Sequence, residues 1–157
     1  MDQKDTGGIV KRVPMFQGFR PEQLDRLLEA FEERTFEAGD YLFKEGDSST
    51  EMHILVSGHL QIQTSTGSEI ATIGEMGIVG EMGVLTGHTR SATVRADQPS
   101  KCLCIKRRDL FRLMEDDKDI GYQVYRNVTH VLCERLRDNN ILLEQQYLIL
   151  EDLAEGE

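Results

Sequence analysis

The sequence has no tryptophan and, in 157 residues, only three prolines and three cysteines. The odd cysteine number and the absence of zinc or redox spacing argue against a disulfide framework or a metal site. Cys102 and Cys104 would share one face of a strand, so we expect buried, reduced thiols. No apolar run is long enough to span a membrane, and the first residues lack the layout of a signal peptide. We therefore expect a cytoplasmic protein that does not bind membranes.

Basic residues are also scarce. Eighteen lysines and arginines face 28 acidic residues, which gives a formal net charge of −10. Because phosphate neutralisation supplies most of the affinity for nucleic acids, and no useful basic cluster is visible, we expect no direct nucleic-acid binding. There is no Gly-x-Ser-x-Gly elbow and no Walker loop, and the four histidines are scattered along the chain. These absences exclude the common enzyme and metal-site patterns, so we expect no enzymatic activity and no metal.

The length corresponds to one domain. Residues 1–8 read as a flexible tail that ends in Gly7-Gly8, and residues 9–33 as an N-terminal helical segment. Over residues 34–118 the apolar period changes to two, with short strands separated by glycine-rich turns, which is typical of an antiparallel β-barrel or jelly roll. Residues 119–157 form a long C-terminal helix and tail. The predicted class is thus α+β.

The long helix can be up to ~50 Å long, more than so small a barrel can cover. Its apolar stripe is close to a heptad seam, interrupted by Arg135, Asn139 and Gln146. Such a helix either packs on its own barrel or pairs with a second copy. Because the stripe extends past any plausible barrel contact, residues 128–153 favour a parallel homodimer.

The segment 80–94 has the residue types that a small anionic ligand with hydroxyl groups requires. A short helix over roughly 81–85 would present unpaired amides and a partial positive charge to an anion. Arg90 adds a planar, permanently charged fork that matches phosphate oxygens. Glu81 only accepts hydrogen bonds at neutral pH, so it suits a sugar hydroxyl. A glycine-rich turn followed by a surface arginine is the simpler alternative.

The order Gly80-Glu81-x-Gly-x-Leu85, followed by Arg90-Ser91-Ala92-Thr93-Val94, resembles the phosphate-binding cassette of cyclic nucleotide-binding domains. The likeness covers most of residues 10–115. It implies that Glu81 binds the ribose 2′-hydroxyl and that Arg90 pairs with the cyclic phosphate, assisted by the Ser91 hydroxyl and nearby amides. The ligand-binding residues implied in this segment are Gly80, Glu81, Met82, Arg90, Ser91, Ala92 and Thr93.

In this family the long helix caps the base. The resemblance places Asn139 and Asn140 at that position, where an amide could read a base edge. A single asparagine at a seam can instead set helix register. The implied ligand is cAMP, with cGMP possible.

We thus predict a regulatory sensor module that signals by repositioning its C-terminal helix. The alternative is a dimerising interaction scaffold of the same fold that binds no ligand or a different one. Family activators carry a DNA-binding helix pair after the long helix, and none follows here. We therefore expect a free-standing sensor or the sensor segment of a larger protein, acting on an unidentified effector protein or output domain.

Overall fold

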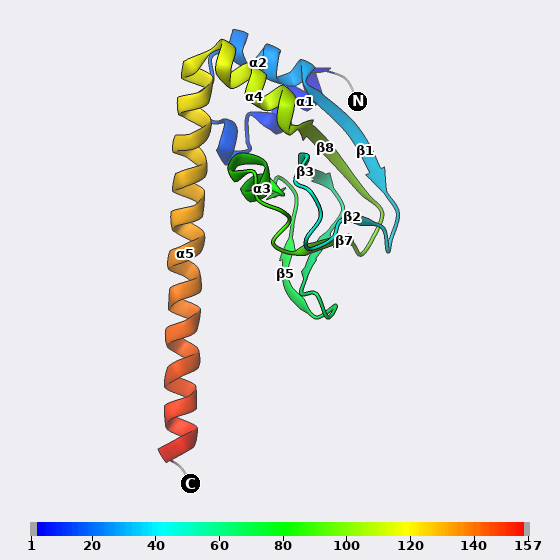
Figure 1. Cartoon of the computed structure of the whole chain (residues 1–157). Coiled ribbons are helices and arrows are strands. Elements are labelled where there is room, and N and C mark those ends of the chain that lie inside the picture. The colour runs from blue at the N-terminus through cyan, green and yellow to red at the C-terminus, as the bar shows by residue number, and fades with distance from the viewer. Residues whose placement is uncertain (1–2, 156–157) are drawn as a thin grey trace.

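Eight strands form two sheets in the computed structural model, which describes residues 3–155 (Figure 1). One sheet has the order β1-β8-β3-β6 and the other β2-β7-β4-β5, with every pair antiparallel. The arrangement confirms the α+β prediction in its jelly-roll form, because the sheets do not close into a barrel. The strands are β1 (Phe31–Phe36), β2 (Tyr41–Phe43), β3 (Glu51–Ser57), β4 (Leu60–Gln63), β5 (Glu69–Ile73), β6 (Ile78–Val79), β7 (Thr93–Ala96) and β8 (Ser100–Lys106).

Helices cover one end and one face of the first sheet. They are α1 (Gln3–Val10), η1 (Pro14–Phe16), α2 (Pro21–Glu29), α3 (Glu81–Thr86), α4 (Arg107–Asp116) and α5 (Lys118–Glu155). Among residues 3–155, no helix combines the length and the hydrophobicity needed to cross a membrane.

Two apolar cores hold these elements together. One lies between the sheets, where Leu55, Leu60 and the two strand cysteines are buried. The other joins the first sheet to the helices through side chains such as Phe16 and Ile105. Burial of this apolar area is the main stabilising term of the fold.

The N-terminal boundaries differ from the prediction. Residues 1 and 2 lie outside the described range, but α1 begins at Gln3, so the predicted tail over 1–8 is wrong from that residue on. Gly7 is buried, and a Cβ there would lie 3.3 Å from the Leu28 side chain. The glycine lets α1 pack closely on α2, and this contact outweighs its poor helix propensity. The helical segment also ends earlier than residue 33, since β1 begins at Phe31.

The 38-residue helix α5 has two parts. Its first turns pack on the core through Ile120, Val124 and Val128. Asn127 Nδ2 fixes it to the N-terminal segment by donating to the backbone oxygens of Met15 at 3.1 Å and Gln17 at 2.8 Å. From residue 133 to 154 every residue is exposed, and the helix projects away from the sheets (Figure 1). The long helix therefore extends beyond its own domain, as predicted.

Candidate functional site

The cassette connects β6 to β7 through α3, and two glycines determine its shape. Gly80 precedes α3 with φ 85°, in the left-handed region that favours glycine. A Cβ at Gly80 would lie 2.4 Å from Arg90 Nη1, and one at Gly83 would lie 1.9 Å from Ser49 Oγ. Both positions are therefore restricted to glycine by close neighbours, and the turn can bring Arg90 against the start of α3.

Arg90 is the buried cation of this site, with only 5% of the residue exposed. Its Nη1 donates to Gly80 O at 3.2 Å and its Nη2 to Glu51 O at 2.5 Å. The guanidinium lies 3.9 Å from the centre of the Phe43 ring. Within residues 3–155, its buried Nε has no hydrogen-bond partner.

The electrostatic environment of Arg90 contains opposing effects. Burial lowers the pKa of the guanidinium, while the nearby carboxylates of Glu51, Asp47 and Glu81 raise it. A buried charge with an unpaired donor costs free energy, and an anion placed against it would offset that cost. The arrangement is therefore suited to receiving a negatively charged group.

Glu81, the first residue of α3, is buried but ion-paired. Arg135 reaches across from α5 and places Nη1 2.6 Å from Glu81 Oε1. The Glu81 side chain is 8% exposed and that of Arg135 45%. This ion pair joins the cassette to the long helix at the point where α5 leaves the domain.

A small apolar pocket lies between these charged groups. It has a volume of about 100 Å³. Six of the predicted residues line it: Gly80, Glu81, Met82, Arg90, Ser91 and Ala92. The remaining lining residues that the sequence alone did not identify include Phe43, Ile62, Ile73, Val79 and Arg135. The cassette, strands of both sheets and α5 thus all contribute to the lining of this pocket.

Three predicted residues do not line this pocket. Thr93 Oγ1 accepts a hydrogen bond from Glu45 N at 3.0 Å, so it connects β7 to the preceding turn. Asn139 and Asn140 are exposed on α5, beyond Arg135, and lie outside the pocket of their own chain. The helix has already separated from the sheets at this point, so the residue that reaches the cassette is Arg135, one turn earlier. In the sequence, Arg135 was noticeable as a charged residue that interrupts the apolar stripe of the long helix.

The described residues contain no group of three or more His, Cys, Asp or Glu side chains arranged to hold a metal ion. The available chemistry is a buried guanidinium, a buried carboxylate, a short helix start and an apolar wall. Together with the two sheets, these features define a jelly-roll domain whose pocket is suited to a small anionic ligand.

The comparisons with known proteins identify the family. The family model for the cyclic nucleotide-binding domain matches residues 33–117, more than half of the chain. A cyclic nucleotide-gated cation channel protein of Drosophila melanogaster is 32% identical over 144 residues, which cover 87% of this chain and 21% of that protein. The chain belongs to the cyclic nucleotide-binding domain family.

Two further proteins extend this comparison. The cyclic AMP receptor protein of Thermus thermophilus is 27% identical over 139 residues, which cover 86% of this chain and 62% of that protein. A cyclic nucleotide-binding domain from Methylobacillus flagellatus has the same fold, with a TM-score of 0.75 at 24% identity, covering 87% of this chain and 79% of that one. This chain spans about a fifth of the fly channel protein and less than two thirds of the Thermus receptor.

Proposed function

We propose that this domain binds a cyclic nucleotide, with cAMP favoured over cGMP, and acts as a regulatory sensor. The observation that carries the proposal is the buried Arg90, which has an unpaired Nε and faces the pocket beside Glu81. In this proposal Arg90 binds the cyclic phosphate and Glu81 accepts a ribose hydroxyl. The Thermus relative, a cyclic AMP receptor protein, supports the choice of cAMP.

The size of the pocket supports a mechanism in which α5 moves. Its volume of about 100 Å³ is below the roughly 300–1,000 Å³ typical of small-molecule sites. The Arg90 guanidinium donates hydrogen bonds to two backbone carbonyls, and the Arg135 guanidinium is paired with the Glu81 carboxylate. A nucleotide that takes these partners must displace or rearrange Arg135. Binding would thereby shift the equilibrium between two positions of α5, which a downstream effector can read.

Calorimetric titration with cAMP, cGMP and 5′-AMP tests this proposal. We expect a cyclic nucleotide to bind and 5′-AMP to bind more weakly. Arg90→Lys keeps a charge but loses the planar fork, so its affinity should fall about tenfold or more. Arg126→Lys makes the same change at an exposed arginine of α5 as a matched control and should change the dissociation constant less than twofold. Equal affinities of both variants and the parent protein would refute the assignment.

We further propose that α5 forms a homodimer through residues 128–153. Large apolar side chains at 136, 143 and 150 repeat every seven residues, and all three are more than half exposed. An exposed apolar stripe of this length favours association. Light scattering should give twice the 17.9 kDa chain mass, and Leu143→Asp combined with Leu150→Asp should give the monomer. A monomeric parent protein would exclude the dimer and leave the nucleotide proposal to its own test.

A further inference from the structure

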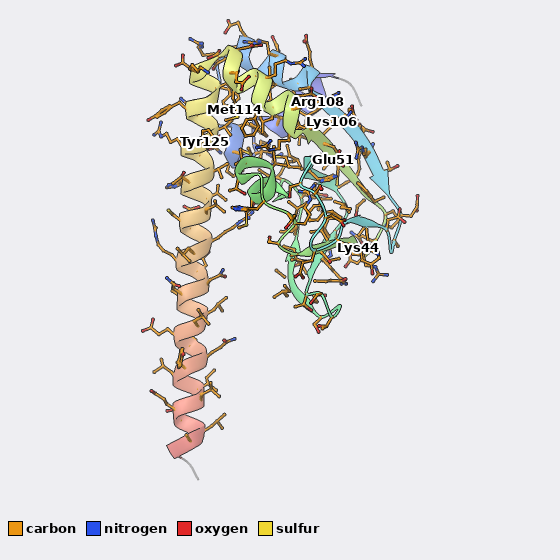
Figure 2. All side chains as sticks on the ribbon, in the orientation of Figure 1. Lys44, Glu51, Lys106, Arg108, Met114 and Tyr125 are labelled. Carbon is orange, nitrogen blue, oxygen red and sulfur yellow. The ribbon has the colours of Figure 1, made fainter. Side chains whose placement is uncertain are left out.

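A second cavity lies beside the end of α3, at residues 87–89 of the cassette. It has a volume of about 610 Å³, within the range of small-molecule sites. Three segments line it: residues 48–51, residues 87–89 and residues 106–108, where β8 runs into α4. It shares no lining residue with the cassette pocket. We call this cavity the α4 pocket. Figure 2 shows Lys106 and Arg108 at this junction, with Glu51 on the neighbouring strand.

Two charged residues that line the α4 pocket are neutralised by partners outside it. Lys106 Nζ lies 2.7 Å from Glu32 Oε1. Glu51, the carboxylate of the pocket, accepts a hydrogen bond of 2.5 Å from Arg34 Nη1. In each of these two ion pairs the opposite charges largely cancel. The remaining charge of the pocket therefore comes from the arginines that follow Lys106.

The two arginines differ in how firmly they are held. Arg107 Nε donates to Val84 O at 2.8 Å, and its guanidinium lies 4.5 Å from the Phe111 ring centre. Within residues 3–155, the terminal nitrogens of Arg107 have no hydrogen-bond partner. Arg108 is exposed, and its Nε lies 3.3 Å from the carboxylate of the adjacent Asp109. One guanidinium is therefore pre-positioned, and the other can move toward an occupant.

The start of α4 lies at the same cavity. Its N-cap residue, Lys106, makes no side-chain cap, and the first amide, that of Arg107, donates to Thr50 O at 2.8 Å. The next amides of a first helical turn have no intrahelical acceptor and carry a partial positive charge. Three residues with hydroxyl side chains, Ser48, Thr50 and Thr89, also line the cavity. A helix start, two arginines and several hydroxyls together match the oxygens of a phosphate group.

We propose that the α4 pocket binds a small ligand with a phosphate or polyphosphate group, independently of the cyclic nucleotide site. Two arginines around one cavity favour a multiply charged anion over the singly charged cyclic phosphate. The cavity has room for a ligand larger than a phosphate group. Of the three successive basic residues at this helix start, Lys106 is paired with Glu32, so Arg107 and Arg108 are the two that would meet the ligand.

The test is a titration of the ¹⁵N-labelled protein with inorganic pyrophosphate and, separately, with ADP, followed by amide chemical shifts. We expect saturable shifts at Gly87 and Thr89. Gly80 and Ser91 line the cassette pocket and not the α4 pocket, so anion binding in the cassette pocket is seen separately. Tighter binding of ADP would identify a nucleotide-type ligand, and equal binding would assign the affinity to the phosphates alone. Shifts confined to Gly80, Ser91 and the other residues of the cassette pocket, or no saturable shift, would refute the proposal.

Two matched variants distinguish binding at the α4 pocket from a non-specific effect of the net charge. Arg108→Glu should weaken pyrophosphate binding about tenfold or more, because a charge-assisted contact is replaced by repulsion. An acidic residue in the first turn of α4 is favourable, so the variant should fold. Arg112→Glu makes the same charge change on an exposed position of α4 outside the pocket and should change binding less than twofold. Equal losses in both variants would reduce the effect to net charge and overturn the proposal.

Discussion

The ion pair between Arg135 and Glu81 gives the sharpest test of how α5 is held. It joins α5 to the cassette with an Nη1–Oε1 distance of 2.6 Å. Arg135→Met keeps the length and apolar stem of the side chain but removes the charge. Glu81→Gln keeps the shape and an acceptor oxygen. The two single changes should have unequal effects, because only one partner is buried.

The expected magnitudes follow from that difference in burial. With Arg135 removed, the Glu81 carboxylate is left buried and unpaired, and we expect a loss of about 1–2 kcal/mol of unfolding free energy. With Glu81 neutralised, the guanidinium can turn into water, since 45% of its side chain is already exposed. We therefore expect the Glu81→Gln variant to lose only about 0.5 kcal/mol of unfolding free energy. A coupling energy of about 0.5–1 kcal/mol should remain between the two sites.

Urea unfolding of the parent, both single variants and the double variant measures this coupling. Arg135→Met should also lower the melting temperature by about 2–6 °C for a chain of this size. Arg137→Met is the control, since it removes another exposed charge from the same helix. Hydrogen exchange should quicken in the α5 turn around Arg135 in the Arg135→Met variant only. Additive free energies with unchanged exchange would show that the ion pair does not hold α5 to the cassette.

Three further predictions concern the domain itself. Gly83→Ala should destabilise it by about 1–3 kcal/mol in urea unfolding, because a Cβ would lie 1.9 Å from Ser49 Oγ, whereas Gly8→Ala, with open space around it, should not destabilise it. His53 and Arg34 lower the pKa of Glu51 from 4.5 to about 2, so its stabilising contribution is complete above pH 4.5 and is lost as the pH falls toward 2. The loss should be about 1–2 kcal/mol in acid unfolding after solvent screening, and Glu51→Gln should remove it. A thiol reagent should label one cysteine, Cys133, in the native protein and all three in urea, because the other two are buried and burial raises their pKa to about 12.

The sequence predicted the parts of the fold that depend on local pattern. Two-residue alternation with glycine turns was enough for the jelly roll, and apolar spacing was enough for α2 and α5. It was not enough for α1, because Gly7 and Gly8 have poor helix propensity. The packing of Gly7 against Leu28 stabilises α1. A contact between two helices leaves no pattern in the local sequence, so the sequence could not predict it.

The candidate site also has a part that the local sequence predicts and a part that depends on tertiary structure. The cassette residues from Gly80 to Ala92 are close in sequence, so one motif located them together. The contribution of α5 depends on where a helix more than forty residues downstream passes the cassette, which is a tertiary property. Arg135, one turn before Asn139, is the residue that reaches Glu81, because α5 leaves the domain immediately after it. A role of Asn139 or Asn140 at a base would require the paired helices proposed above. The Leu143→Asp and Leu150→Asp variant therefore tests that role too: cAMP affinity should fall with the loss of the dimer if the asparagines contact the base, and stay unchanged if they only set helix register.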